Sequence, residues 1–408
     1  MASSDRPAPS ALRKRLGFMG ANPLLPPVAA GILSGTLYGL SLPTADLGWL
    51  AWICLVPVLA VAFKPISTGG ALASGLAMGV VAGGFRVYWI SETLGRYGGL
   101  DIAASVSTTC LLVLYLALYP MLFLGICCSL RRDISHTGRG RLGAGFAFPW
   151  LAASTWALLD WAQTWMISGF PWAVLGTSQY REPLILSFAA LAGVHGLTFA
   201  IVAVNGGLAQ LLLAKRRRHR LAGGGAVLLP ILVVVAWSNF HLSRLAEPTS
   251  PSLRVGIVQG NIGQDVKWNP GWKQATAQKY IDLTRSLSKA SGRLDLILWP
   301  ETALPFRFDD VAHTPIRRSV RQLAVDLDTP LLIGGLGSKS RTGQPGLFNR
   351  SFLIGRDGRL VDSGDKVHLV PFGEYLPFPW FFGYMSGLTA QSGAFDPGQE
   401  HAVITLPA

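Results

Sequence analysis

Long apolar segments fill most of the first 245 residues, and they restrict the fold more than any other feature of the sequence. A helix that crosses a bilayer needs about 20 mostly apolar residues. Segments near that length or longer, separated by short polar or basic connections, span residues 22–42, 46–63, 69–90, 101–129, 144–162, 183–213 and 222–240. The sequence therefore predicts a polytopic α-helical membrane domain with about seven transmembrane helices.

The composition changes near residue 245. Charged residues make up 14% of the whole chain, whereas a soluble protein has about a quarter. The deficit lies in the first part, because residues 250–408 have the mixed composition of an ordinary globular α/β domain. We therefore predict a cytoplasmic N-terminal segment at 1–21, a membrane domain at 22–245 and a globular domain at 250–408.

The basic residues lie mostly in short clusters between apolar segments, at 13–15, 131–141 and 215–220. Cytoplasmic loops of membrane proteins carry an excess of Lys and Arg, and these clusters share one side if the N-terminus is cytoplasmic. An odd number of crossings then places residues 245–408 outside the cytoplasm. Despite a net charge of +13, this pattern favours membrane lipids as partners and no nucleic acid.

One segment does not have the composition of a spanning helix. Residues 161–182 combine Trp161, Trp165 and Trp172 with Gly, Pro and polar residues. Amphipathic aromatic side chains favour the interface between membrane and water. The segment is predicted to be either an interfacial or re-entrant element on the outer side, or an ordinary aromatic belt.

Residues 250–408 alternate between strand and helix patterns. The turn residues Asp357 and Gly358 in SFLIGRDGRLVDS predict a hairpin. The order β-α-β-α-β-β indicates a layered α/β domain. Further strands are predicted within 252–262, 294–306 (ending at Trp299) and 329–337, and helices at 271–289 and 315–327.

Three ionisable residues are candidates for catalysis. Glu301 follows a wholly apolar strand, where a carboxylate is costly unless it is solvated or paired. Lys366 and Glu374 flank an apolar, proline-containing run that neither helix nor strand packing requires. The residues alone leave other interpretations open: a structural salt bridge for Glu301, a solvated Lys366, and a turn cap at Glu374.

Two motifs narrow these alternatives. LILWPETALPF at 296–306 and DKVHLVPFGEYLPF at 365–378 resemble the carbon–nitrogen hydrolase (nitrilase) superfamily in its membrane-embedded branch, the apolipoprotein N-acyltransferases. RVGIVQGNIGQDVKW, FNRSFLIGRDGRL and GFPWAVLGTSQ add to the resemblance, which covers most of the chain. It implies a helical membrane domain followed by a nitrilase-like α-β-β-α sandwich, with 250–408 as a partial, C-terminally incomplete copy of that domain.

The resemblance also implies roles for individual residues. The family uses a Glu-Lys-Cys triad, in which Glu301 matches the general base and Lys366 the lysine that stabilises the oxyanion. Glu374 matches a second acid that supports the lysine. Trp268 matches an aromatic on a loop at the lipid entrance, and Trp172 a membrane-side aromatic that flanks it.

The implied reaction transfers an acyl chain from a phospholipid, through a cysteine thioester, to the N-terminal amine of a diacylglyceryl-modified apolipoprotein. The implied partners are therefore the phospholipid acyl donor, the apolipoprotein acceptor and membrane lipids. No cofactor and no metal are implied. The implied location is the bacterial inner membrane, multi-pass, with the catalytic domain on the periplasmic side.

The sequence departs from the family at the nucleophile. Cys54, Cys110, Cys127 and Cys128 all lie in apolar segments, and residues 129–408 contain no cysteine. Three hydroxyl residues near the expected position, Ser386, Thr389 and Ser392, are in no nucleophile motif. The sequence thus predicts an acyltransferase that is truncated before its cysteine and inactive by itself. The alternatives are a non-catalytic lipid-binding relative and a membrane-anchored amidase or nitrilase acting on a small amide.

Overall fold

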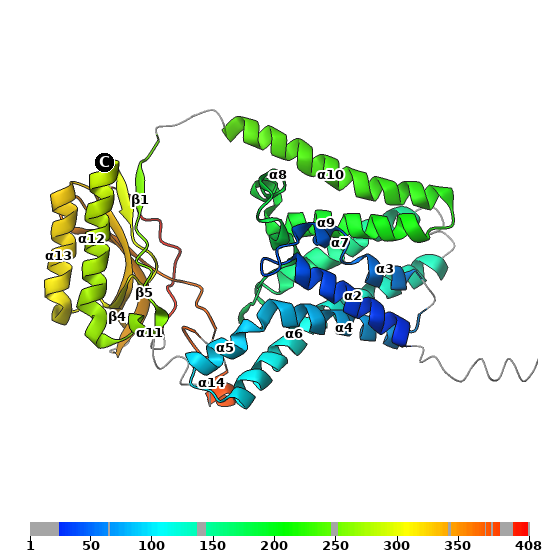
Figure 1. Cartoon of the computed structure of the whole chain (residues 1–408), viewed down its shortest axis with the longest axis horizontal. Helices are drawn as coiled ribbons and strands as arrows, with labels where there is room; N and C mark the ends of the chain where they lie inside the picture. The colour runs from blue at the N-terminus through cyan, green and yellow to red at the C-terminus, as the bar shows by residue number, and fades with distance from the viewer. Residues whose placement is uncertain are drawn as a thin grey trace, which may run out of the picture. The chain divides into compact units, whose positions relative to one another are not determined.

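The chain divides into two compact units. A computed structural model describes residues 24–63, 66–136, 144–245, 252–341, 344–371, 373–376, 378–383 and 395–406. The helical unit comprises Met1–Glu92 and Ile102–Glu247, and the α/β unit comprises Thr93–Asp101 and Pro248–Ala408 (Figure 1).

Every predicted apolar segment contains helix. The segment 46–63 differs from the others because it is broken into a 3₁₀ turn and a short helix. The helical elements are α2 (Leu25–Ser41), η1 (Gly48–Trp52), α3 (Val56–Ala62), α4 (Thr68–Val87), α5 (Trp89–Arg96), α6 (Ile102–His136), α7 (Ala144–Ala162), η3 (Met166–Ser168), η4 (Leu175–Gln179), α8 (Pro183–Leu186), α9 (Ala189–Leu213) and α10 (Arg217–Leu245).

Four of the described helices are long and apolar enough to cross a membrane, judged by length and composition. They are Thr68–Val87, Ile102–Arg131, Ala189–Leu213 and Arg217–Arg244. The α10 helix leaves Leu228, Leu229 and Leu232 more than half exposed, as expected of a helix in contact with lipid. The chain is therefore a membrane protein.

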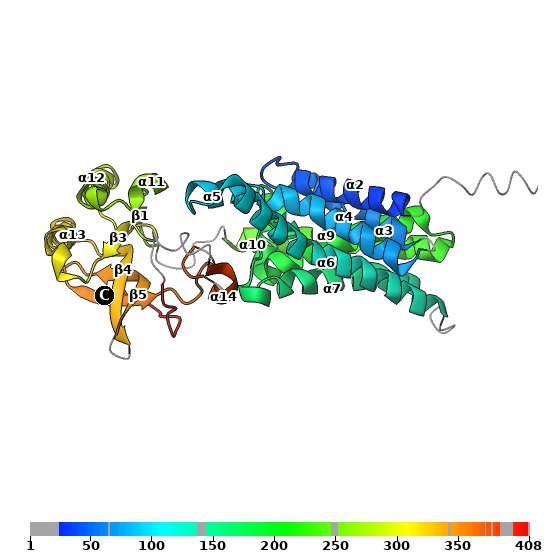
Figure 2. The same ribbon diagram turned by 90° about the horizontal axis from the view of Figure 1, so that it is seen from below.

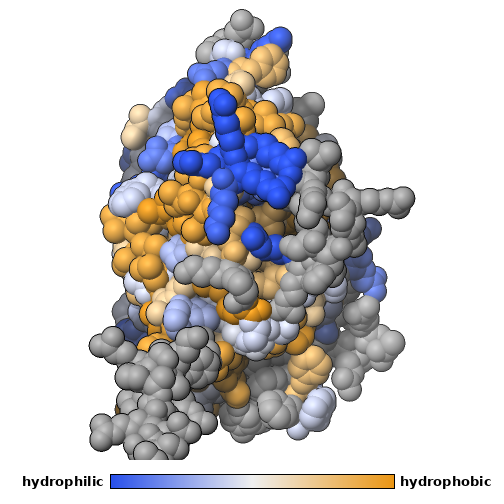
Figure 3. Space-filling view, turned by 90° about the vertical axis from the view of Figure 1, so that its right-hand side faces the viewer, coloured by the Kyte–Doolittle hydropathy of each residue, from blue (hydrophilic) through white to orange (hydrophobic). Residues whose placement is uncertain are grey.

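One face of the molecule is largely hydrophobic and carries a cluster of hydrophilic residues (Figure 3). The connection between α9 and α10 carries the basic cluster predicted to set topology, and its Lys215, Arg216 and Arg217 are exposed. Of the other two basic clusters, 13–15 lies outside the described residues, and 131–141 lies within them only up to residue 136.

The break in segment 46–63 is stabilised by a buried amide on α9. Asn205 accepts a hydrogen bond from the Leu55 backbone N–H at 2.8 Å and donates one to the Ala51 carbonyl at 2.9 Å. An interrupted helix inside a membrane bundle is tolerated only where its freed backbone groups find such partners. Asn205 thus satisfies both ends of the interruption.

Glycines bring α2, α4 and α6 into close backbone contact (Figure 2). A Cβ atom built on Gly35 would lie 2.6 Å from the Met78 carbonyl oxygen, and one on Gly79 would lie 2.5 Å from the Cα of Ala117. Small residues at helix interfaces in membranes permit this approach and maximise packing contacts. The three helices are therefore joined through glycine seams.

Replacing Gly79 with leucine is expected to destabilise the helical unit by about 1–3 kcal/mol, because α6 must move away. The measurement is a thermal melt of the full chain in detergent. Gly84→Leu on the same helix is the matched control, since a Cβ there meets no described atom within 4 Å. Equal melting temperatures for the two variants would contradict the close packing.

The α/β unit contains a mixed sheet. Its described strands run in the order β1-β2-β4-β5-β6, with β3 also paired to β4. The elements are β1 (Val255–Ile257), α11 (Gln264–Lys267), η5 (Pro270–Trp272), α12 (Lys273–Ser291), β2 (Leu296–Leu298), β3 (Leu304–Arg307), η6 (Val311–His313), α13 (Thr314–Leu327), β4 (Leu331–Arg341), β5 (Gln344–Ile354), β6 (Leu360–Asp365) and α14 (Pro379–Phe382).

The sheet combines parallel and antiparallel strand pairs. β1, β2 and β4 are parallel, whereas β4, β5 and β6 are antiparallel. Helices α12 and α13 cover one face of the sheet (Figure 1), and Ile297, Leu331 and Val320 are fully buried in the core. The predicted strands, helices and hairpin are present, but β3 was not predicted as a strand of its own.

Candidate functional site

Glu301 occupies a tight turn directly after β2. The strand is anchored by Ile297, which is fully buried, and Trp299 is 5% exposed. The chain then turns, with Thr302 at a φ of 51°, in the left-handed region. A Cβ on Gly334 of β4 would lie 2.7 Å from the Thr302 nitrogen, so only glycine lets this turn lie against the sheet. The local packing therefore fixes where Glu301 leaves the sheet.

Lys366 and Glu374 come from the segment that follows β6. The Lys366 backbone N–H continues the pairing with β5 by donating to the Asn349 carbonyl at 2.9 Å. The loop beyond folds back on itself, since Val370 and Glu374 exchange two hydrogen bonds. The Glu374 N–H donates to the Val370 carbonyl at 2.9 Å, and the Val370 N–H donates to Glu374 Oε2 at 2.7 Å.

These three side chains meet at one point. Lys366 Nζ lies 3.0 Å from Glu301 Oε1 and 3.0 Å from Glu374 Oε2. The Glu374 side chain is 12% exposed and that of Lys366 is 29% exposed, whereas the Glu301 side chain is 61% exposed. The ammonium is thus held between a buried carboxylate and one that is open to a reactant.

Asn349 on β5 joins the two carboxylates, and the sequence analysis did not identify it. Its Nδ2 donates to Glu301 Oε1 at 2.5 Å and to Glu374 Oε1 at 2.8 Å, and the residue is 6% exposed. An amide nitrogen has two donors, so both are used. Its place in the FNRS segment carries no sequence signal of these contacts, because the partners lie 48 and 25 residues away.

The electrostatics of the cluster favour its ionised form. Partial burial raises the pKa of Glu301, but the hydrogen bond and charge of Lys366, with Asn349 and the Lys267 cation, outweigh it and hold that pKa below its ordinary value. Burial lowers the pKa of Lys366, but the two carboxylates outweigh it and raise that pKa above its ordinary value. The ion cluster therefore persists from mildly acidic to alkaline pH.

Asn349→Leu is expected to slow the chemistry of this site roughly tenfold to hundredfold, because hydrogen bonds to charged groups contribute about 1.5–3 kcal/mol. Asn349 lowers the pKa of Glu301. Its loss should therefore raise that pKa and move the acid limb of the rate–pH profile to higher pH. Gln278→Leu, which removes an exposed amide from α12, is the control. An unchanged acid limb would contradict the role of Asn349.

Trp268 lies at the end of α11 in the same unit. Its side chain is partly buried against a small cluster of Leu336, Leu369 and Phe395. The neighbouring Lys267 is the cation that lowers the pKa of Glu301, and burial lowers the pKa of Lys267 itself despite the opposing effect of Glu301. The α11 segment thus adds a second positive charge near Glu301.

Trp172 belongs to the helical unit and is 48% exposed. Its ring lies against Trp89, with centroids 5.0 Å apart, and against Phe170 at 6.1 Å. Residues 161–182 contain the short turns η3 and η4. Whether they form an interfacial or re-entrant element or an ordinary aromatic belt stays a prediction. The relation of Trp172 to the Lys366 cluster stays a prediction, because the two residues belong to different units.

The α/β unit, which holds this cluster, contains no cysteine in its sequence. The free cysteines lie in the helical unit, where Cys54, Cys127 and Cys128 are buried and Cys110 is exposed. The hydroxyls of Ser386, Thr389 and Ser392 lie outside the described residues.

Comparison with known proteins assigns each unit separately. The apolipoprotein N-acyltransferase N-terminal domain matches residues 34–207, and the carbon–nitrogen hydrolase domain matches residues 254–405. The match to a solved carbon–nitrogen hydrolase from Helicobacter pylori G27 covers 36% of this chain and 45% of that chain, with 14% identity and a TM-score of 0.25.

Curated relatives match across both units. An apolipoprotein N-acyltransferase of Geobacter metallireducens is 33% identical, with 91% of this chain and 69% of the relative covered. The apolipoprotein N-acyltransferase of Shewanella oneidensis is 35% identical, and the match covers 72% of this chain and 54% of the relative. That of Photobacterium profundum is 31% identical, and the match covers 74% of this chain and 55% of the relative. The chain thus spans between about half and two thirds of the length of these relatives.

A helical membrane unit followed by a carbon–nitrogen hydrolase domain with a Glu-Lys-Glu cluster defines a membrane-bound member of that superfamily. Within it, the chain belongs to the apolipoprotein N-acyltransferase family. The predicted family and fold class are therefore confirmed, and the described strands of the α/β unit form one sheet with helices on one face.

Proposed function

We propose that this chain carries the acyl-transfer site of its family: the acyl group of a phospholipid passes to the N-terminal amine of a diacylglyceryl-modified apolipoprotein. The observation that carries the proposal is the ammonium of Lys366 held 3.0 Å from both Glu301 and Glu374. An exposed carboxylate beside a fixed cation is the arrangement that general-base catalysis with oxyanion stabilisation requires.

In the first half-reaction, Glu301 takes the proton of a thiol, and the sulfur attacks the ester carbonyl of the phospholipid. Lys366 stabilises the negative oxygen of the tetrahedral intermediate. The C–O bond then breaks, Glu301 gives its proton to the leaving alkoxide, and a lysophospholipid departs. An acyl thioester remains on the protein.

In the second half-reaction, the lipoprotein amine attacks the thioester carbonyl while Glu301 accepts the amine proton. Collapse of the second tetrahedral intermediate breaks the C–S bond and returns the proton to sulfur. The products are an N-acylated lipoprotein and a free thiol, so no oxidant or cofactor is consumed. Glu374 and Asn349 hold Lys366 and Glu301 in place throughout.

The thiol is the part that residues 129–408 do not contain. The test therefore uses the chain together with any coding sequence that continues in frame after codon 408, read first from the DNA. A cysteine encoded there supports the acyltransferase, whereas a stop codon at that point supports a non-catalytic lipid-binding relative.

The assay compares two substrate classes. The acyltransferase is expected to move a labelled acyl chain from phospholipid to a diacylglyceryl lipopeptide and to leave small amides intact. Release of ammonia from a small amide, without acyl transfer, would identify a membrane-anchored amidase instead.

For the location, we propose the bacterial inner membrane with the α/β unit on the periplasmic side. The support is the placement of basic clusters between apolar segments, since cytoplasmic loops carry such clusters. A protease added outside spheroplasts should cleave the α/β unit; protection of that unit would reverse the orientation.

A further inference from the structure

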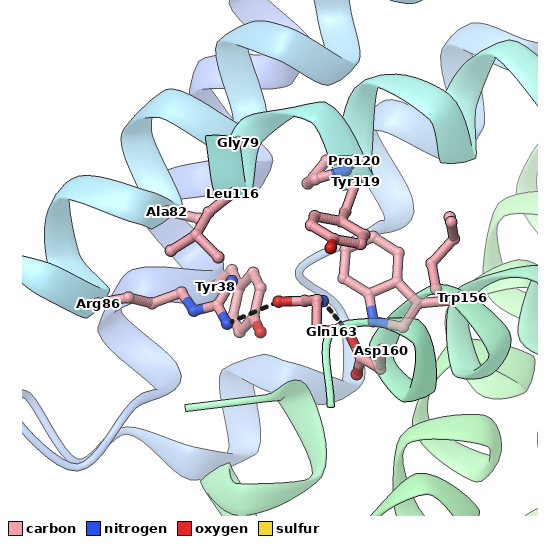
Figure 4. Close-up of a pocket in the computed structure, with 11 residues that line it drawn as sticks. Tyr38, Gly79, Ala82, Arg86, Leu116, Tyr119, Pro120, Trp156, Asp160 and Gln163 are labelled. Atoms are coloured by element: carbon pink, nitrogen blue, oxygen red, sulfur yellow. Dashed lines mark hydrogen bonds between the residues drawn. The ribbon is translucent and has the colours of Figure 1, made fainter. Parts of the chain in front are cut away.

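An arginine and an aspartate are buried inside the helical unit. Arg86 on α4 is 6% exposed, and Asp160 on α7 is 3% exposed. Ionisable side chains within membrane segments are costly and are found where they pair or serve a function. Figure 4 shows both side chains directed toward the same small polar region.

Gln163 connects the two charges. Arg86 Nη2 donates to Gln163 Oε1 at 3.3 Å, and Gln163 Nε2 donates to Asp160 Oδ1 at 3.2 Å (Figure 4). The amide is itself 3% exposed. The Gln163 amide therefore accepts from Arg86 through its oxygen and donates to Asp160 through its nitrogen.

The guanidinium of Arg86 also binds the backbone of the segment that carries Trp172. Its Nε donates to the Trp172 carbonyl at 3.0 Å, and its Nη2 donates to the same oxygen. The next carbonyl, that of Ala173, accepts a hydrogen bond from the Tyr38 hydroxyl at 3.1 Å. Two consecutive carbonyls are thus held by side chains from α4 and α2.

This segment needs such restraint. Ile167 and Ala173 have φ values of 50° and 51°, in the left-handed region that side-chain-bearing residues rarely adopt. The Phe170 N–H is tied back to the Gln163 carbonyl at 2.7 Å. Strained backbone persists only where the surrounding contacts over-determine it, and it concentrates at functional sites.

Trp172 thus has an exposed indole and a backbone that is held in place by hydrogen bonds. Trp172 is half exposed although its carbonyl is bound by a buried cation, and its ring lies against Trp89 and Phe170. A side chain that contacts lipid in one fixed orientation does not have to be ordered when the lipid arrives.

We propose that Arg86 is a positioning residue for Trp172: hydrogen-bonded through Gln163 to Asp160, it fixes the backbone that presents this indole to an incoming acyl chain. The contact with an acyl chain rests on the proposed function. The positioning itself does not, and the two are tested separately.

The test uses ¹⁹F NMR of the full chain in detergent, labelled with 5-fluorotryptophan at its 13 tryptophans. Trp172→Phe and Trp89→Phe assign the two resonances of interest. Arg86→Met is expected to shift or broaden these two signals and to leave that of Trp299, buried in the α/β unit, unchanged. Arg86→Lys keeps the positive charge but loses the planar guanidinium with its several N–H donors. The Trp172 signal of this variant should therefore be displaced less than that of Arg86→Met.

Arg131→Met is the control, because this guanidinium in the same unit donates to the Phe63 carbonyl instead; it should leave Trp172 unmoved. If Arg86→Met disturbs all tryptophan signals, Tyr38→Phe decides, since it removes a single oxygen and one bond to the segment. A Trp172 signal that stays in place in Arg86→Met overturns the proposal, and so does one that stays in place in Tyr38→Phe after Arg86→Met has disturbed every signal.

The acyl-transfer assay separates the positioning of Trp172 from its proposed contact with the acyl chain. Displacement of the Trp172 signal together with a slower transfer rate supports both the positioning and its purpose. Displacement with an unchanged rate retains the positioning and rejects a role for Trp172 in handling the acyl chain.

Discussion

Replacing Lys366 with methionine is expected to reduce acyl transfer by about a hundredfold to a thousandfold, the usual effect of losing one donor to an oxyanion. The side chain keeps its length but loses the charge that lies 3.0 Å from both Glu301 and Glu374. The two carboxylates then remain bridged by Asn349 but lose the ammonium that lies between them. Because Lys366 lowers the pKa of Glu301, that pKa should rise, and the remaining activity should require a higher pH.

The measurement is the transfer rate of the complete gene product across pH. Lys289→Met, an exposed lysine on α12, is the matched control and should retain the wild-type rate. Lys366→Arg should not restore activity, because a planar guanidinium cannot replace a point charge between two carboxylates. A Lys366→Met enzyme with a normal rate would remove the basis of the proposed chemistry.

The second large effect is expected from Glu301→Gln, which keeps the shape of the side chain and removes its basicity. A positioned general base contributes about a hundredfold to ten-thousandfold, and we expect a loss of that order in the rate of thioester formation. Asp326→Asn, at an exposed ion pair on α13, is the control. Normal thioester formation by Glu301→Gln would assign the base to another residue.

The pH dependence gives a further check on the same residue. The base acts as a carboxylate, and its folded-state pKa lies below the ordinary value. Activity and the stability contributed by this ion pair should therefore be present at neutral pH and be lost as the pH falls through the lowered pKa. An acid limb above the ordinary carboxyl pKa would contradict the depressed value.

The sequence predicted the general position of Glu301 for a local reason. An apolar strand that ends in Trp-Pro-Glu delivers the next polar side chain to the edge of the sheet. Lys366 and Glu374 needed the resemblance to known motifs, because their flanking residues do not reveal that the loop folds back on itself. Trp268 and Trp172 were likewise placed by resemblance, and their role at a lipid entrance stays a prediction.

Two features escaped the sequence analysis because they depend on distant partners. Asn349 lies 48 residues from Glu301 and 25 from Glu374, and an uncharged amide in a strand gives no signal of such contacts. Asn205 lies 150 residues from Leu55, whose backbone it satisfies, so the break in segment 46–63 has no local cause that hydropathy could show. The strand β3 was missed for a simpler reason: it contains Pro305, which is unusual within a sheet.

The glycine seams between α2, α4 and α6 have a consequence for where hydrocarbon can go. Backbone atoms abut at Gly35 and Gly79, so no methylene chain fits between these helices. Fatty acyl tails can contact the outer surface of the layer formed by α2, α4 and α6 (the three-helix plate) but cannot pass between these helices. A bulky photoreactive lipid should therefore label the rim of the plate, such as exposed Leu33 of α2 and Leu118 of α6, and spare the residues along its seams.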